Sequence, residues 1–321
     1  MLMRFSLQRA TEPSLNQRNP PRVPNLIGGA FVDSKSTSTI DVINHMRSHI
    51  IFLCIEVVEH ARGMATLQIG EYVPNVSSRI DTYSVREPLR ICAGNCPFNF
   101  PAMIPLWCRV VTGNTFILKP SERDPGASIM LAELAIEAGL PHGVLNIVHG
   151  TNDIVNAICY DDDIRAMSFV GSNTSNMGAK NHGIVMPEAN KDATLNALVA
   201  AGQRCMALGT IVFAGDSESW VSFENKLVEC AKALKVNSRT EPDADLGSVI
   251  SKQGKECISR LIQSGVDSGA KLLLDGRNIV VPRYGQGNFI GPTILSGVTA
   301  DMECYKADSL EEAINIFNRN K

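Results

Sequence analysis

The chain has 321 residues, of which 44% are hydrophobic and 20% are charged, and its formal net charge is −3. This length is sufficient for two domains, each with its own core. The small net charge and an aromatic content of 6% argue against nucleic-acid binding. No apolar run approaches the roughly 18 residues that a membrane-spanning helix needs, so we expect a soluble protein with no membrane partner.

Nine cysteines are present, an odd number without a repeating interval. This pattern favours a reducing compartment over a secreted disulfide framework. Cys92 and Cys96 have no second Cys/His pair at matching spacing, so we expect no zinc site.

The first 22 residues contain four arginines but a single acidic residue, Glu12. A basic, weakly amphipathic start of this kind is typical of a mitochondrial transit peptide or its remnant. A disordered tail rich in proline and asparagine explains the same composition, and both interpretations remain open.

From Ile91 onward, short β-rich runs alternate with stretches of helix length. The pattern predicts a strand at Thr115–Leu118, a helix from Asp124 to Ala138, and strands at Val144–Val148 and Ala166–Val170. Alternation of this kind is typical of an α/β protein with a parallel, doubly wound sheet.

A second αβ series follows, and we place the boundary between two domains near residues 181–183. Its expected elements are a strand at Gly183–Met186, a helix at Asn190–Val199, a strand at Leu208–Phe213, long helices at Glu218–Leu234 and Lys252–Ser268, and a short strand at Lys271–Leu274.

The most informative motif is Gly202-Gln203-Arg204-Cys205-Met206-Ala207. It places one cysteine among small residues and beside a guanidinium, which favours the nucleophilic thiolate. A thiolate can add to an aldehyde carbon and, after loss of hydride, carry the acyl group as a thioester. The alternative is that Cys205 is a small buried hydrophobe, as most free cysteines are.

A second motif, Pro97-Phe98-Asn99-Phe100-Pro101, holds a carboxamide between aromatic rings and prolines. Such a stiffly held amide is suited to hydrogen-bonding a developing oxyanion. Alternatively, Asn99 is an ordinary loop residue that satisfies its own backbone.

The third motif is Leu118-Lys119-Pro120-Ser121-Glu122, at the carboxyl end of an expected strand. Doubly wound sheets bind ligands at this edge. A solvated Lys/Glu pair near a helix start is the alternative.

Together the three motifs resemble the aldehyde dehydrogenase superfamily. The longer runs Pro97–Trp107 and Asn176–His182 are similar to its methylmalonate-semialdehyde dehydrogenase branch, and the resemblance extends from about Val23 onward. It implies a doubly wound NAD-binding domain over residues 23–181 and an αβ catalytic domain over residues 182–321, both incomplete.

The resemblance implies a role for each matching residue. Cys205 would be the nucleophile, Asn99 the oxyanion donor and Arg204 the partner of a substrate carboxylate, or alternatively a structural neighbour that favours the thiolate. The residues expected to contact NAD are Phe98, Lys119, Ser121, Glu122 and Ser172.

Asn176 stands where hydrolytic members of the superfamily have a glutamate. An asparagine cannot accept the proton of an attacking water, whereas a coenzyme A thiol needs little base assistance. The resemblance therefore implies mitochondrial oxidation of malonate or methylmalonate semialdehyde to acetyl- or propionyl-CoA, in valine or pyrimidine catabolism. A plain hydrolytic enzyme is disfavoured.

Five departures from the family pattern lead us to expect little or no dehydrogenase activity from this chain. They are a large gap after Asn44, Leu53 in place of an arginine, a missing turn near Trp107–Arg109, three residues (173–175) in place of a helix, and Lys306–Ala307 in place of a segment that grips the nicotinamide ribose. The family is homo-oligomeric, and its C-terminal oligomerisation strand has no counterpart before Lys321. A non-catalytic remnant that binds coenzyme A, a nucleotide or a paralogue is therefore the second interpretation.

Overall fold

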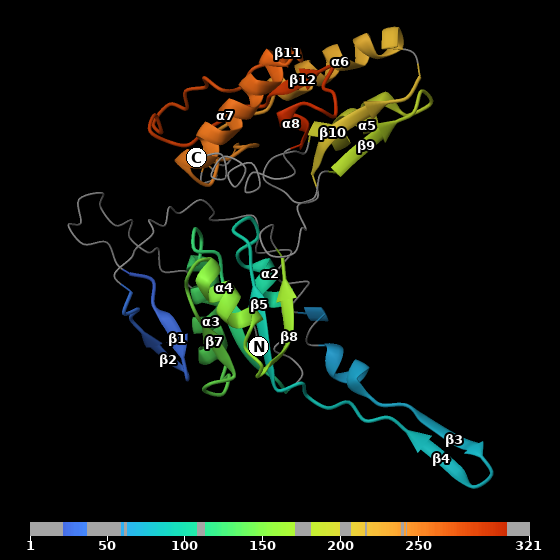
Figure 1. Cartoon of the computed structure of the whole chain (residues 1–321), viewed down its shortest axis with the longest axis vertical. Coiled ribbons are helices and arrows are strands. Elements are labelled where there is room, and N and C mark those ends of the chain that lie inside the picture. The colour runs from blue at the N-terminus through green and yellow to red at the C-terminus, as the bar shows by residue number, and fades with distance from the viewer. Residues whose placement is uncertain are drawn as a thin grey trace.

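The computed structural model describes residues 22–36, 59–60, 63–107, 113–170, 181–199, 207–215, 217–238, 241 and 243–306. Strands β1 to β8 lie between residues 25 and 169, called the N-terminal half below, and strands β9 to β12 lie between residues 181 and 296, called the C-terminal half. In Figure 1 these two sets of elements form two separate groups of secondary structure.

The larger sheet has six strands in the order β2-β1-β7-β6-β5-β8. Its strands are β1 (Asn25–Ile27), β2 (Ala30–Val32), β5 (Ile91–Asn95), β6 (Thr115–Lys119), β7 (Leu145–Ile147) and β8 (Ile164–Phe169). The four strands β5 to β8 are parallel. The chain runs from β5 through β6 to β7 in one direction, and β8 then lies on the other side of β5, so the order reverses between β5 and β8 as in doubly wound sheets.

The predicted doubly wound α/β fold is therefore confirmed, with one addition. Strand β1 pairs antiparallel with β7 and with β2, which makes the sheet mixed. No pattern in the sequence predicts this hairpin, because its strands are only three residues long.

Among the described residues, three helices connect successive parallel strands of this sheet. They are α2 (Met103–Trp107) between β5 and β6, α3 (Gly126–Glu137) between β6 and β7, and α4 (Asn152–Cys159) between β7 and β8. Helix α3 follows Pro125 and ends where Gly139 adopts φ +94°, a conformation that favours glycine. Buried side chains of the sheet and α3, such as Phe116, Ile147 and Ala132, form one core.

The C-terminal half contains two small sheets and four helices among its described residues. The elements are β9 (Asn181–Val185), α5 (Lys191–Val199), β10 (Leu208–Phe213), α6 (Ser217–Lys232), α7 (Lys252–Asp267), β11 (Lys271–Leu274), β12 (Ile294–Ser296) and α8 (Glu303–Lys306). Strands β9 and β10 are parallel, whereas β11 and β12 are antiparallel. The predicted elements of this half agree with the structure within two residues at each end.

A second core lies under α5 and α6. The rings of Phe213 and Trp220 are stacked with centroids 4.8 Å apart, and Phe223 meets both rings edge-on. Phe223 is 1% exposed, so this aromatic cluster anchors α6 on β10.

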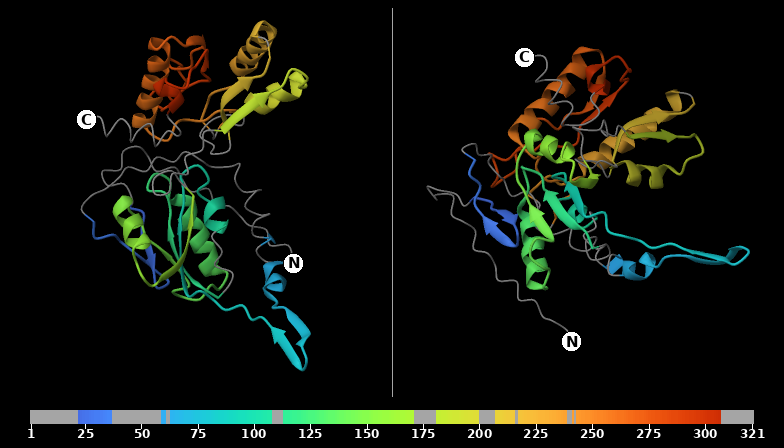
Figure 2. Two further views of the ribbon diagram at one scale, coloured as in Figure 1. Left: turned by 45° about the vertical axis from the view of Figure 1, so that its right-hand side comes forward. Right: turned by 60° about the horizontal axis from the view of Figure 1, so that its bottom comes forward.

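The hairpin of β3 (Tyr72–Ser77) and β4 (Ile80–Tyr83) projects from the N-terminal half. Figure 2 shows it extended away from the other elements in both views, and every one of its strand residues is exposed. A 3₁₀ helix, η1 (Met64–Gln68), precedes it. Among the described residues, no helix is both long and apolar enough to cross a membrane.

Candidate functional site at the carboxyl edge of the parallel strands

Two of the three sequence motifs meet at one edge of the larger sheet. Beyond the ends of β5 and β6, the backbone N–H of Cys96 donates to the carbonyl of Lys119 at 3.0 Å. On the other side of β5, the N–H of Val170 donates to the carbonyl of Asn95 at 3.2 Å. These bonds continue the parallel ladders, so the segments after β5, β6 and β8 leave the sheet together at the point where the strand order reverses.

The segment Pro97–Pro101 is firmly held at this edge. The N–H of Ile104 donates to the carbonyl of Phe100 at 3.2 Å, and the hydroxyl of Ser128 on α3 donates to the carbonyl of Pro101 at 3.2 Å. The ring of Phe100 packs on the main core. Asn99 and Phe98 are half-buried in this stiff segment, as the sequence predicts, while their catalytic and cofactor roles stay predictions.

Lys119 is buried, with only 4% of its surface exposed. Its ammonium donates to the carbonyl of Pro120 at 3.0 Å and pairs with the Glu122 carboxylate at 3.3 Å. The Glu122 side chain is 32% exposed, so the carboxylate still reaches solvent. A fully solvated surface pair, the alternative considered above, is therefore excluded for the lysine.

Ser121 shapes the turn that carries this pair. Its hydroxyl is buried and accepts a hydrogen bond from the N–H of Arg123 at 3.2 Å. One positive donor and one acceptor carboxylate are consequently fixed side by side at the carboxyl end of β6. This donor set fits the two hydroxyls of a ribose, since one hydroxyl can accept and the other can donate.

Two ionisable residues near this edge were not assigned any role by the sequence analysis. Burial raises the pKa of the Asp124 carboxyl to about 6, just before α3. Burial also lowers the pKa of His149, a hydrogen bond with the carbonyl of Pro24 raises it, and the nearby charge of Lys119 lowers it further. The sequence could have drawn attention to His149, because this residue directly follows the predicted strand Val144–Val148.

The remaining predicted site residues are Arg204, Cys205, Ser172 and Asn176, and they lie outside the described residues. So do Leu53 and the chain after Lys306. The nearest described residue to the cysteine in sequence is Ala207, whose carbonyl accepts a hydrogen bond from the side-chain amide of Asn181 at 2.9 Å.

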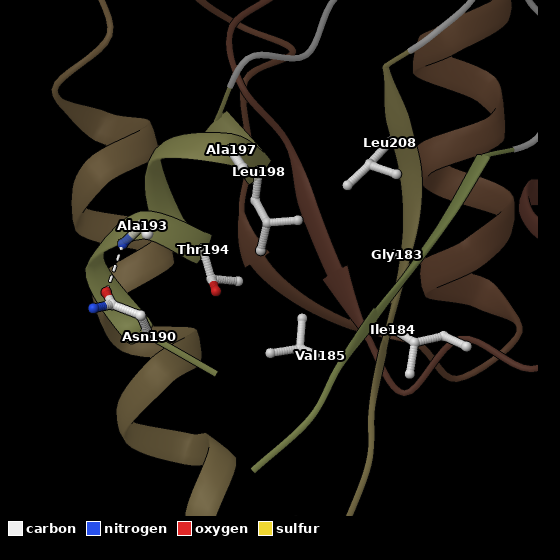
Figure 3. Close-up of a pocket in the computed structure, with 9 residues that line it drawn as sticks. All are labelled: Gly183, Ile184, Val185, Asn190, Ala193, Thr194, Ala197, Leu198 and Leu208. Carbon is white, nitrogen blue, oxygen red and sulfur yellow. Dashed lines mark hydrogen bonds between the residues drawn. The ribbon is translucent and has the colours of Figure 1, made fainter. Parts of the chain in front are cut away.

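A pocket of about 370 Å³ lies elsewhere, between β9 and α5 with Leu208 of β10 at its side. Figure 3 shows that most of its lining side chains are apolar, and that Asn190 instead bonds the N–H of Ala193 at the start of α5. Of the predicted catalytic and cofactor residues that the structure describes, namely Phe98, Asn99, Lys119, Ser121 and Glu122, none lines it. The pocket is therefore separate from the Lys119–Glu122 pair, which lies at the other sheet.

Comparison with known proteins decides the family. The model of the aldehyde dehydrogenase family matches residues 36–310. The chain belongs to the aldehyde dehydrogenase family. The resemblance based on three short motifs is thus confirmed over most of the chain.

Within this family the chain is similar to proteins named methylmalonate-semialdehyde dehydrogenase [acylating], mitochondrial. It is 55% identical to the one from Arabidopsis thaliana, with 98% of this chain and 69% of that protein covered. It is 49% identical to the human methylmalonate-semialdehyde/malonate-semialdehyde dehydrogenase [acylating], with 84% of this chain and 57% of that protein covered.

A solved aldehyde dehydrogenase structure gives the same result for the fold. A crystal structure from Sinorhizobium meliloti, complexed with NAD, is 41% identical and superimposes with a TM-score of 0.75 over 83% of this chain and 62% of that chain.

The alignments also support the predicted internal gaps. The match to the Arabidopsis protein extends over 422 positions, which exceeds the 321 residues of this chain. That relative therefore has segments inside the matched region that this chain lacks, and the chain spans between 57% and 69% of the length of the two named relatives.

Proposed function

We propose that this chain is an NAD-dependent, coenzyme A-acylating dehydrogenase of malonate or methylmalonate semialdehyde. The names of the Arabidopsis and human relatives support the substrate, the acyl transfer and a mitochondrial location. The NAD in the Sinorhizobium meliloti structure supports the cofactor.

The observation that carries the proposal is that the segments with Asn99 and with the Lys119–Glu122 pair leave the sheet at the same edge, where the N–H of Cys96 donates to the carbonyl of Lys119. In doubly wound folds, ligands bind in the crevice outside the carboxyl ends of the strands where the order reverses. The buried ammonium of Lys119 and the half-exposed carboxylate of Glu122 suit the adenosine ribose of NAD, with Phe98, Ser121 and Ser172 as further contacts. When bound, NAD supplies the hydride acceptor.

In this proposal Cys205 performs the first covalent step. Its thiolate adds to the aldehyde carbon, and the carbonyl electron pair moves onto the oxygen. The side-chain amide of Asn99 and the backbone N–H of Cys205 donate hydrogen bonds to that oxyanion. Loss of hydride from the same carbon leaves the acyl group on sulfur as a thioester. Arg204 holds the substrate carboxylate bidentately.

The identity of residue 176 determines which nucleophile releases the acyl group. Because its carboxamide has no basic site near neutral pH, it cannot activate water for hydrolysis. The thiol of coenzyme A attacks the thioester instead, takes the acyl group and returns the Cys205 thiolate. The bond between the α-carbon and the substrate carboxylate breaks, carbon dioxide leaves, and the α-carbon takes a proton in its place, which gives acetyl-CoA or propionyl-CoA.

The test is an assay of the purified chain with malonate semialdehyde and NAD, with and without coenzyme A. We expect NADH formation that depends on coenzyme A, and an acyl adduct on Cys205 by mass spectrometry when coenzyme A is omitted. Cys205→Ser should abolish both signals. Cys159→Ser is the matched control, because Cys159 is an exposed cysteine at the end of α4.

Two results would contradict the proposal. NADH formation that persists in Cys205→Ser would remove the nucleophile assignment. A correctly folded chain that forms neither NADH nor the adduct would instead support the second interpretation, a non-catalytic member of the family.

A further inference from the structure

The first residue of β9 makes an unusual contact with β10. Asn181 pairs with Leu208 in the parallel register, and the register shifts between Leu208 and Thr210. At this irregularity the side-chain amide of Asn181 donates to the carbonyl of Ala207 at 2.9 Å. A β-bulge disturbs the backbone ladder, and here a side chain supplies the bond that fixes the start of β10.

The acceptor of this bond lies close to the proposed nucleophile in the sequence. Ala207 is two residues after Cys205, and it is the first described residue beyond the segment that carries the cysteine. The amide of Asn181 therefore fixes the backbone at the point where that segment joins β10.

His182, the next residue of β9, contacts helix α8. The Nε2 atom of His182 lies 3.0 Å from the hydroxyl of Tyr305 on α8, and the two rings meet edge-to-face with centroids 5.8 Å apart. Helix α8 is in turn fixed on α7, because the hydroxyl of Ser264 donates to the carboxylate of Glu303 at 3.0 Å. These side chains thus link the start of β9 to α7 through α8.

We propose that Asn181 is a positioning residue for the nucleophile, and that the His182–Tyr305 contact keeps Asn181 in place. The inference rests on the proposed function, since it assumes that Cys205 is the nucleophile. Hydride transfer needs near-attack geometry, and a displacement of about 1 Å can cost roughly a hundredfold in rate. The β9–β10 sheet has two strands among the described residues, and it gains this precision from the Asn181 amide.

The experiment compares two substitutions of one residue. Asn181→Ala removes the side chain, whereas Asn181→Asp keeps its shape but lacks the N–H donor. Both should lower kcat by about 10- to 100-fold. The KM for NAD should stay within about twofold, because the cofactor contacts lie on the other sheet and distant sites act independently. Amide hydrogen exchange of peptides spanning residues 203–210 should become faster in both variants.

Asn190→Ala is the matched control. It too removes an asparagine side chain that bonds the backbone, but this one accepts from the N–H of Ala193 at 3.0 Å, at the start of α5. It should leave kcat and the exchange of residues 203–210 unchanged. Tyr305→Phe removes only the hydroxyl and should act in the same direction as Asn181→Ala, with a smaller loss of kcat.

Three outcomes would overturn the inference. Asn181→Asp could behave like the wild type, which would show that shape and not the donor matters. Exchange of residues 203–210 could be unaffected in both Asn181 variants. A parallel rise in the KM for NAD would indicate general unfolding. If the wild type itself forms no NADH, the proposed function fails separately, and the exchange measurement still decides whether Asn181 fixes this segment.

Discussion

The two sets of parallel strands in this chain differ in how completely they are covered. In the six-stranded sheet, Ala93, Phe116 and Leu118 of β5 and β6 are between 1% and 4% exposed. In the β10–β9 pair, Ile184 is 70% exposed and Val212 is 46% exposed. Parallel strands are normally buried on both faces. The proposed cofactor site therefore lies at the edge of a well-covered six-stranded sheet. The proposed nucleophile instead precedes the β10–β9 pair, which is less covered and is held by side-chain contacts.

The largest expected effect tests whether the two cores are independent. Phe223→Ala removes the buried ring that meets Phe213 and Trp220, and truncations of this kind cost about 3–5 kcal/mol of unfolding free energy. Trp220 fluorescence during urea unfolding should report the loss. NAD affinity should change by less than about twofold if distant sites act additively.

Ile147→Ala is the counterpart in the larger sheet, where Ile147 is 0% exposed. It should cost about 2–5 kcal/mol and should weaken NAD binding, because β7 lies beside β6. If both variants weaken NAD binding equally, the two sheets unfold as one unit and the contrast between them does not hold.

The second prediction concerns the buried ion pair at the proposed cofactor edge. Lys119→Met keeps much of the side-chain volume but removes the donor, and a charged hydrogen bond contributes about 1.5–3 kcal/mol. NAD should therefore bind roughly 10- to 100-fold more weakly, measured by titration calorimetry. Lys232→Met is the matched control, because Lys232 forms an exposed pair with Glu229, also three residues apart, at 3.0 Å. Equal losses in the two variants would contradict the ribose assignment.

The third prediction uses the buried carboxyl of Asp124. Burial raises its pKa from the ordinary 3.8 to about 6 in the folded chain, so the folded state binds this proton more tightly than the unfolded state. The charged form destabilises the fold progressively between these two values, and the full penalty is present above about pH 6. Asp124→Asn should stabilise the chain by about 1–2 kcal/mol near pH 8, after allowance for solvent screening.

This gain should vanish below about pH 4, which thermal melts across the pH range would reveal. A gain that is the same at every pH would mean that Asp124 acts through something other than its charge. His149 provides the opposite sign, because its lowered pKa gives stability that is present above its ordinary value of 6.5 and is lost on acidification.

The same contrast explains how much the sequence could predict. Elements whose apolar residues follow a clear pattern were placed well, including Leu208–Phe213 and Lys271–Leu274, which agree with the structure at both ends. The β3–β4 hairpin escaped prediction because its residues are all exposed and leave no buried face to read. Exposure of Ile184 could not be foreseen either, since an apolar strand has the same sequence whether or not other strands cover it.

For the site, the sequence predicted that Lys119 and Glu122 follow a strand at its carboxyl end, and β6 does end at Lys119. It did not predict that the segment with Asn99 leaves the sheet at the same edge, and the roles of all three residues stay predictions. Burial of Lys119 was not readable from its sequence, since lysine is rarely buried. Asn181 and Tyr305 are 124 positions apart, and no local pattern indicates that His182 would bring them together. Contacts of this kind depend on packing between distant helices and strands.

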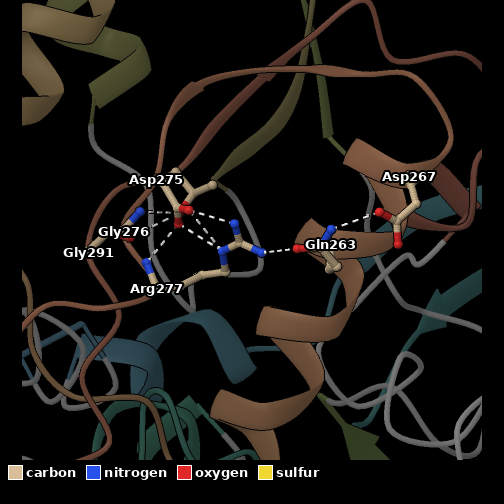
Figure 4. A network of polar contacts seen from close by, with 7 residues as sticks. Gln263, Asp267, Asp275, Gly276, Arg277 and Gly291 are labelled. Atoms are coloured by element: carbon tan, nitrogen blue, oxygen red, sulfur yellow. Dashed lines mark hydrogen bonds and ion pairs between the residues drawn. The ribbon is translucent and has the colours of Figure 1, made fainter.

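The smallest expected effect concerns the pair of Arg277 and Asp275 in the C-terminal half, whose side chains are 19% and 32% exposed. Figure 4 shows Arg277 bonded to Asp275 and to Gln263 of α7, with an Nη2–Oδ2 distance of 2.6 Å. Arg277 lowers the pKa of Asp275 mainly through this side-chain hydrogen bond. The resulting stabilisation is present above the ordinary value of 3.8 and is lost as the pH falls through the lowered value.

Asp275→Asn should therefore lower the melting temperature at neutral pH by only about 1–2 °C, and by less at high salt because exposed pairs are screened. Lys252→Gln, which breaks an exposed contact with Glu256 at 4.0 Å, should have no measurable effect. A shift for Asp275→Asn that is large and independent of salt would mean that this network holds α7 against the β11–β12 loop as firmly as a core contact. In that case the C-terminal half would depend on polar bonds for its stability as well as for the position of its strands.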